Sequence, residues 1–249
     1  CLGRCREAVA DHDRIVKLSR GAADARLSRG ATRRAASDFF GALSDAEAVL
    51  SRRPRAASAW LLKAEALRGL GREEDSLSAA ARACALAPGR SWAWTVRAKA
   101  ARQARRLDEA LRFSRRACEL DPGDAKAWAW RGDILRALGR GAQARRALER
   151  ALSLAPAVAW PRAVLAEVKR EAGDARAAVA LWAETFRLDP RCSGAYDILG
   201  TEPSSVTEDP QRAWAYAWRA VARGLCADAS GAESDNARAR VLAPGLFAP

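Results

Sequence analysis

Five prolines stand 34 residues apart, and this interval constrains the fold more than any other feature of the chain. They are Pro54, Pro88, Pro122, Pro156 and Pro190. A fixed period of this length indicates one unit of supersecondary structure that is stacked repeatedly. Each unit of such an array buries its apolar face only against its neighbours, so the chain needs no single large core. We therefore expect a repeat array rather than one globular domain.

Further columns agree when the chain is aligned at this period. The alignment gives four units, 57–90, 91–124, 125–158 and 159–192, which share large apolar, small and glycine positions. The shared columns are the fourth position (Trp60, Trp94 and Trp128), the eighth (Ala64, Ala98, Gly132 and Ala166) and the fifteenth (Gly71, Gly139 and Gly173, with Arg105 as the exception). Gly132 predicts the closest approach of two helices in its unit.

The unit 125–158 resembles the tetratricopeptide repeat (TPR) family, whose pattern is W-x2-L-G-x2-Y, A-x3-F and a final proline. The residues that carry the resemblance are Trp128, Gly132, Leu135, Ala144, Leu148, Ala151 and Pro156. The resemblance implies an all-α fold, a right-handed superhelical solenoid of antiparallel helix pairs. The seventh position, usually leucine, departs from the pattern as Lys63, Arg97 and Arg131, and Trp130 is a candidate to supply the missing apolar bulk in its unit.

The chain outside the four repeats keeps only part of the pattern. Residues 1–56 predict an N-terminal amphipathic helix, 2–18, followed by a degenerate first repeat with Ser37 as a helix cap. Residues 193–226 predict a partial repeat and a capping helix that seals the last apolar face of the array. The small and polar residues of 227–249 predict a flexible tail.

Charge and cysteine placement bear on compartment and partners. The net charge is +13, which reflects either an arginine-rich composition or a field that recruits acidic partners or nucleic acid. Cys84 and Cys118 occupy the same column of successive repeats, so we expect packing residues in a reducing, cytoplasmic compartment. Cys1 leaves a lipid anchor as an alternative. The sequence shows no apolar run long enough to span a membrane and no signal peptide. It also lacks methionine, so we expect either a processed product or an excerpt of a longer protein, and favour the excerpt.

No group of residues in the sequence predicts catalysis, a metal site or a bound cofactor. His12 is the only histidine, and between Asp11 and Asp13 we expect it on a solvated helix face. The cysteines lack C-x2-C spacing, and no glycine-rich phosphate loop is present. These residue patterns favour a non-catalytic protein.

The resemblance instead implies a partner-binding concave groove lined by the first helix of each repeat. Within this groove the twelfth position is always arginine. The second position is Ser58, Trp92, Lys126 and Trp160, and the ninth is Glu65, Lys99, Asp133 and Glu167. The predicted partner-binding residues are Arg68, Trp92, Lys99, Arg102, Lys126, Arg136, Trp160 and Arg170. The within-helix pairs that would partly neutralise them are Glu65–Arg68, Asp133–Arg136 and Glu167–Arg170. No acid of this kind accompanies Lys99 and Arg102, so we expect the groove to be most positive there.

Three functions follow from these observations. The first is a protein-interaction scaffold that binds an acidic segment with an aromatic or apolar anchor. The second is the recruiting arm of a larger enzyme, since TPR arrays precede catalytic domains in some glycosyltransferases. The third is nucleic-acid binding through the basic surface, although no RNA-reading motif is present. The lysine and asparagine clamp with which some TPR proteins grip a C-terminal carboxylate is absent, which disfavours chaperone-tail docking.

Overall fold

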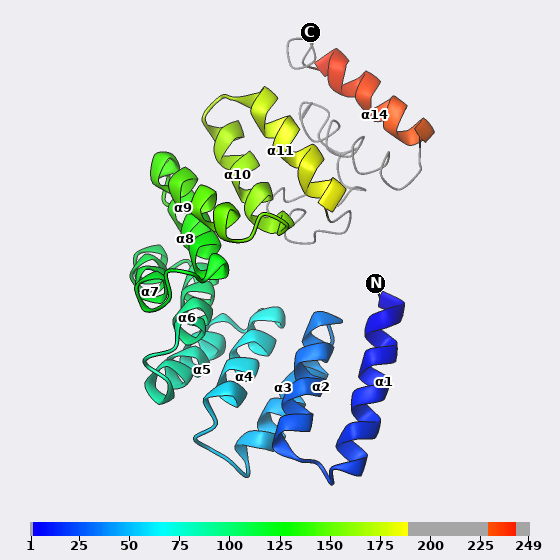
Figure 1. Cartoon of the computed structure of the whole chain (residues 1–249), viewed down its shortest axis with the longest axis vertical. Coiled ribbons are helices and arrows are strands. Elements are labelled where there is room, and N and C mark those ends of the chain that lie inside the picture. The colour runs from blue at the N-terminus through cyan, green and yellow to red at the C-terminus, as the bar shows by residue number, and fades with distance from the viewer. Residues whose placement is uncertain (1, 189–228, 243–249) are drawn as a thin grey trace. The chain divides into compact units, whose positions relative to one another are not determined.

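Helices form every element of the chain that the computed structural model describes, which is residues 2–188 and 229–242 (Figure 1). The helices are α1 Leu2–Leu18, α2 Ala23–Ala35, α3 Phe39–Leu50, α4 Ala57–Gly69, α5 Glu73–Leu86, α6 Ser91–Gln103, α7 Leu107–Leu120, α8 Ala125–Ala137, α9 Gly141–Leu154, α10 Ala159–Glu171, α11 Ala175–Leu188 and α14 Ala229–Leu242. The predicted all-α repeat array is confirmed. The predicted partial repeat and capping helix over 193–226 lie outside the described residues.

The tail predicted to be flexible contains a helix. Ala229–Leu242 forms α14, within the stretch 227–249. The prediction weighed the small and polar residues of this segment as loop formers. Alanine, glutamate and arginine within it have high helix propensity, which accounts for the difference.

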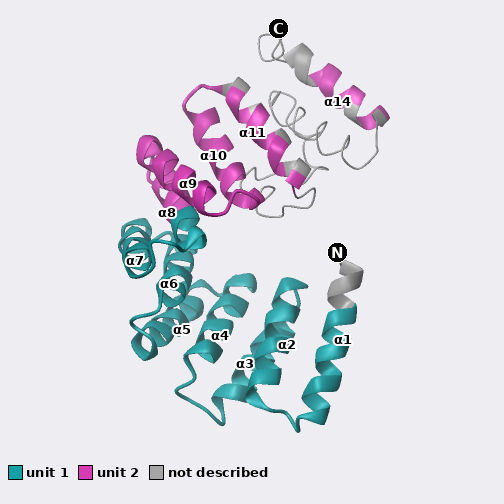
Figure 2. Cartoon of the chain, viewed as in Figure 1, with its two compact units in different colours: residues 1–130 teal, residues 131–249 magenta. Residues whose placement is uncertain are grey.

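The chain divides into two compact units, residues 1–130 and 131–249 (Figure 2). In the first unit α2 packs on α3, α4 on α5 and α6 on α7, and the first helices of consecutive repeats also touch, α2 with α4 and α4 with α6. In the second unit α10 packs on both α9 and α11. Short turns reverse the chain between the two helices of each pair.

The core is built from small residues, so that the helices of a pair approach closely. The eighth-position residues Ala64, Ala98 and Ala166 are fully buried. At Gly132 a Cβ atom would lie 2.5 Å from Cγ of Leu148 in the facing helix α9. The predicted close approach at Gly132 is therefore confirmed.

The repeat tryptophans fix the turn that precedes their own helix. Each is half-buried, and its indole Nε1–H donates to the carbonyl of the proline six residues earlier. The bonds are Trp60 to Pro54 (2.8 Å), Trp94 to Pro88 (2.8 Å) and Trp128 to Pro122 (3.0 Å). Trp94 and Trp128 also pack on a cluster of Ala117, Cys118 and Ala127, so these two rings contribute to packing between helices.

Both predicted packing cysteines, Cys84 and Cys118, are buried, and neither forms a disulfide within the described residues. Burial raises the pKa of the Cys84 thiol to about 11, although nearby Arg97 acts in the opposite direction. The Cys84 side chain is therefore a neutral packing group at physiological pH.

Basic residues at the seventh position are held by aromatic rings and by acids. The guanidinium of Arg97 lies 4.1 Å from the ring centroid of Phe113 and 5.8 Å from that of Trp94. Lys63 donates to Glu47 at 2.8 Å. Stacking of this kind lets a long basic side chain cover apolar surface where the family usually has leucine.

The fifteenth position is left-handed in every repeat, including the two without glycine. The backbone φ angle is +57° at Arg105 and +62° at Ser37, close to the +70° of Gly139. Ser37 is thus a turn residue and not the helix cap that the sequence predicted. Asp38 caps α3 instead, because its carboxylate accepts a hydrogen bond from the Gly41 N–H at 2.8 Å.

Replacing Arg105 with glycine should raise the free energy of unfolding by about 0.5–1 kcal/mol. The left-handed conformation costs an L-residue roughly 1–2 kcal/mol, and the greater freedom of glycine in the unfolded chain offsets part of this gain. Urea titration followed by circular dichroism measures the change. Gly139→Ala is the matched control and should lose about 1 kcal/mol, because an added Cβ there meets no atom within 4 Å and only the backbone is strained. A loss of stability in Arg105→Gly would contradict the prediction.

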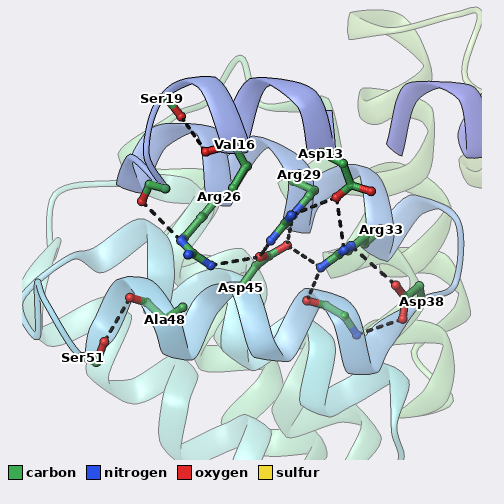
Figure 3. Close-up of polar contacts among 12 residues, drawn as sticks. Asp13, Val16, Ser19, Arg26, Arg29, Arg33, Asp38, Asp45, Ala48 and Ser51 are labelled. Carbon is green, nitrogen blue, oxygen red and sulfur yellow. Dashed lines mark hydrogen bonds and ion pairs between the residues drawn. The ribbon is translucent and has the colours of Figure 1, made fainter. Parts of the chain in front are cut away.

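Ion pairs around the buried carboxylate of Asp45 join α1 to the first helix pair (Figure 3). Asp45 in α3 is 1% exposed and accepts two hydrogen bonds from Arg29 and one from Arg33 at 3.0 Å, both on α2. Arg29 and Arg33 also reach Asp13 on α1, at 2.8 and 3.4 Å. One buried carboxylate and one carboxylate of α1 therefore share the same two arginines. Arg26 lies farther from Asp45, at 3.9 Å.

His12 lies on the same helix and is less exposed than the sequence predicted. Its side chain is half-buried, and its Nδ1 atom is buried with no hydrogen-bond partner among the described residues. The prediction treated α1 as a solvated helix. It is wrong because α1 packs against α2 and is therefore not solvated on every side.

Candidate functional site

The first helices of the repeats carry the candidate binding residues, and we call their second, ninth and twelfth positions the first-helix surface. In the first unit α2, α4 and α6 end with Arg34, Arg68 and Arg102 in their last turns. In the second unit the corresponding residues are Arg136 and Arg170. A cation in the last turn of a helix is stabilised by the partial negative charge of the helix end. The local helix geometry thus favours arginine at each of these positions.

Glu65 on α4 is surrounded by cations in the first unit. Its Oε2 pairs with Nε of Arg34 at 3.0 Å, and its Oε1 pairs with Nζ of Lys99 at 3.0 Å. Arg68 lies near enough to act on both Glu65 and Lys99 through its charge. The Lys99 ammonium also lies 4.9 Å from the ring centroid of Trp130, a cation–π contact. We call Arg34, Glu65, Arg68, Lys99 and Trp130 the Glu65 cluster.

One expected pair is not the one that forms. The sequence predicted a Glu65–Arg68 pair within one helix, and it considered only acids of the same helix beside Lys99. Instead, Glu65 bonds to Arg34 and Lys99, which lie on the preceding and following repeats. Glu65 and Lys99 share the ninth position, so stacking of consecutive first helices brings them together. Trp130, which the sequence assigned to filling space in its own repeat, contacts Lys99 of the preceding one.

Burial and charge act against each other in the Glu65 cluster. The side chains of Glu65 and Lys99 are only 13% and 15% exposed. Burial would raise the pKa of Glu65, but Lys99, Arg34 and Arg68 together hold it below its ordinary value. Burial lowers the pKa of Lys99, and Arg68 and Arg34 lower it further against the opposing effect of Glu65. The cluster therefore holds three cations and one carboxylate in a partly desolvated place.

The arginines of the second unit are balanced by their own acids. Arg136 pairs with Asp133 at 3.3 Å and with Glu171 at 2.8 Å. Burial would lower the pKa of Arg136, but these two carboxylates raise it above its ordinary value. Arg170 pairs with Glu167 at 2.9 Å. The predicted Asp133–Arg136 and Glu167–Arg170 pairs are confirmed. Each of these arginines has an acid of its own helix beside it, whereas in the Glu65 cluster three cations share one carboxylate.

The remaining predicted residues differ in exposure. Trp92 and Trp160 are half-buried on α6 and α10, and Lys126 is exposed at the start of α8. The structure thus brings Arg68 and Lys99 together with Arg34, which the sequence analysis missed. The signal was present, because Arg34 stands one repeat period before Arg68.

Other kinds of site find little support in the part of the chain that is described. Over residues 2–188 and 229–242, no group of three histidine, cysteine, aspartate or glutamate side chains is placed to hold a metal ion. None of the described helices has both the length and the apolar character needed to cross a membrane.

The comparisons with known proteins identify the repeat. The tetratricopeptide repeat family matches the sequence over residues 125–158, and a second form of the same repeat matches residues 32–91. No protein with a curated description matches the chain.

Solved structures with this fold are similar in arrangement but remote in sequence. A thermophilic TPR protein from Thermus thermophilus is 22% identical with a TM-score of 0.66, and the match covers 75% of this chain and 100% of that one. PilW, a widely conserved type IV pilus biogenesis factor, is 16% identical with a TM-score of 0.61, and the match covers 90% of this chain and 94% of that one. A chain of the APC/C hetero-tetramer Cut9–Hcn1 is 14% identical with a TM-score of 0.67, and the match covers 98% of this chain and 51% of that one.

Proposed function

The chain is a tetratricopeptide repeat protein, and from this premise we infer that its first-helix surface binds an acidic segment of a protein partner. The fold supports a protein-interaction scaffold. The observation that carries the finer proposal is the Glu65 cluster, in which three cations face one carboxylate. A partly desolvated surplus of positive charge favours a partner that supplies negative charge.

Apolar anchoring would come from tryptophan on the same surface. Trp92 lies at the second position of α6 and is half-buried, so part of its ring is available for contact. Tryptophan is enriched among residues that dominate binding energy, because its large flat face is desolvated on contact. We therefore expect the bound segment to carry at least one aromatic or apolar side chain beside its acidic residues.

A protein partner accounts for the charges better than nucleic acid does. A nucleic-acid surface requires a series of basic residues that neutralise successive phosphates. Arg136 and Arg170 of the second unit are instead paired with carboxylates of their own helices and of α10. We also propose a reducing, cytoplasmic setting for such a partner, because Cys84 and Cys118 are buried packing residues in equivalent columns of successive repeats.

The first-helix surface is tested by capturing partners and then measuring their affinity for variants. Proteins retained by the immobilised chain after nuclease treatment are identified, purified and titrated by calorimetry. Trp92→Ala should weaken binding about 30-fold, the equivalent of roughly 2 kcal/mol for a binding hot spot. Lys126→Glu should weaken it less and reduce its salt dependence, since this exposed charge acts mainly on the encounter.

Arg115→Glu is the matched control for these variants. Arg115 lies on the second helix α7 and is 71% exposed, so its replacement leaves the first-helix surface intact. Arg136 is less suitable for charge reversal, because Asp133 beside it is 2% exposed and depends on its charge. If Arg115→Glu abolished binding while Trp92→Ala and Lys126→Glu kept it, the partner would bind elsewhere.

A further inference from the structure

We propose that the Glu65 cluster is a subsite for a carboxylate of the acidic segment, and that Glu65 competes with that carboxylate for the same cations. This inference rests on the proposed function and assigns one part of the first-helix surface to one chemical group of the partner. Because Glu65 already occupies these cations, only a segment with enough negative charge would displace it and bind.

The donors of the cluster outnumber the acceptors that face them. Lys99 has three N–H donors and Arg34 has five, whereas Glu65 provides two oxygens, one to each cation. Arg68 adds a third cation, and its buried Nε–H has no hydrogen-bond partner among the described residues. The charged groups that act on Glu65 and Lys99 are each other and these two arginines. A second carboxylate would find unused donors and a net positive field.

The arrangement also explains why a carboxylate would be held firmly rather than loosely. Glu65 and Lys99 are largely shielded from water, and electrostatic interactions strengthen as water is excluded. Arg34 is more accessible, with 34% of its side chain exposed, and so gives an incoming anion a point of approach. Trp130 beside Lys99 fixes the position of the ammonium group by a cation–π contact and offers an aromatic surface next to it.

If Glu65 competes with the ligand, its replacement should raise the affinity for an acidic segment. If Glu65 only forms a structural ion pair, its replacement should lower that affinity or leave it unchanged. Glu65→Gln removes the negative charge that shares Lys99 and Arg34 with the ligand, so binding of an acidic segment should become stronger. A structural carboxylate would instead loosen the cluster on replacement and weaken binding or leave it unchanged. Lys99→Gln should weaken binding under the proposal, because it removes a cation that holds the carboxylate.

The test measures peptide binding to the full chain by fluorescence anisotropy. The probe is a rhodamine-labelled, C-terminally amidated peptide of six glutamates with a central phenylalanine. A second peptide, in which glutamine replaces every glutamate, shows how much of the binding depends on the carboxylates. We expect the glutamate peptide to bind more tightly than the glutamine peptide. Glu65→Gln should strengthen binding of the glutamate peptide about fivefold or more, the effect of one like charge at close range. Lys99→Gln should weaken it by a similar factor, and the indole N–H resonance of Trp130, assigned with Trp130→Phe, should shift on addition of the peptide.

Glu47→Gln is the matched control, because Glu47 also pairs with a lysine, Lys63 at 2.8 Å, but is 53% exposed and lies on α3 outside the first-helix surface. It should bind the glutamate peptide like the unmodified chain. Equal affinity of Glu65→Gln and the unmodified chain would overturn the inference, and so would equal binding of the two peptides. If Trp92→Ala still weakened partner binding in either case, the proposed function would stand without this subsite.

Discussion

Replacing Asp45 with asparagine should lower the free energy of unfolding of the first unit by about 3 kcal/mol, since breaking one partner of a buried ion pair leaves the other charge uncompensated. Asp45 is 1% exposed, and both Arg29 and Arg33 bond to it. These arginines are 14% and 20% exposed, so water can replace little of the lost interaction. Asparagine keeps the shape of the side chain, and the loss therefore reports the charge. Urea titration followed by circular dichroism measures it.

Amide hydrogen exchange should show where the stability is lost. Arg29 and Arg33 also hold Asp13, so the amides of α1 should lose protection together with those of α2. Asp75→Asn is the matched control, because Asp75 forms a 2.6 Å pair with Arg72 but is 55% exposed. Its effect should stay within about 0.5 kcal/mol. Equal losses in the two variants, or unchanged exchange of α1 in Asp45→Asn, would show that the network does not hold this helix.

Backbone features of the fold could be predicted from the sequence because they recur in columns. The 34-residue period places the first helices at Ala57, Ser91, Ala125 and Ala159, and the small eighth position marks where facing helices meet. Arg105 shows the limit of reasoning from residue type. The turn between paired helices imposes a left-handed conformation at the fifteenth position, and the packing on either side outweighs the preference of a single arginine.

Side-chain pairs between repeats could not be predicted in the same way. The expected pairs were those within one helix, where a spacing of three residues fixes the partners. Glu65 instead bonds to residues 31 positions before it and 34 after it, Arg34 and Lys99. The acid that a lysine contacts depends on how the stacked helices are rotated about their axes. The repeat period does not determine that angle. The surplus charge near Lys99 was expected from the sequence, but the carboxylate in its midst was not.

Replacing Gly132 with leucine should lower the free energy of unfolding by about 1–3 kcal/mol through overpacking. A Cβ atom at this position would lie 2.5 Å from Cγ of Leu148 and 3.3 Å from the carbonyl oxygen of Ala144. Leu148 is fully buried and cannot move aside, so α8 and α9 would have to separate. Thermal and urea unfolding measure the loss. Gly141→Ala is the control and should be close to neutral, because a Cβ there meets no atom within 4 Å.

A double-variant cycle should identify Leu148 as the cause. The residues in the same two columns of the repeat 57–90 are Ala64 and Ala80, both fully buried. Gly132→Ala should lose stability by crowding Leu148, and Leu148→Ala should lose about 2–5 kcal/mol by leaving a cavity. The double variant recreates the alanine pair of the repeat 57–90. Its loss of unfolding free energy should therefore be smaller than the sum of the two single losses, by about 0.5 kcal/mol or more. A strictly additive cycle would mean that Gly132 is needed for a reason other than contact with Leu148.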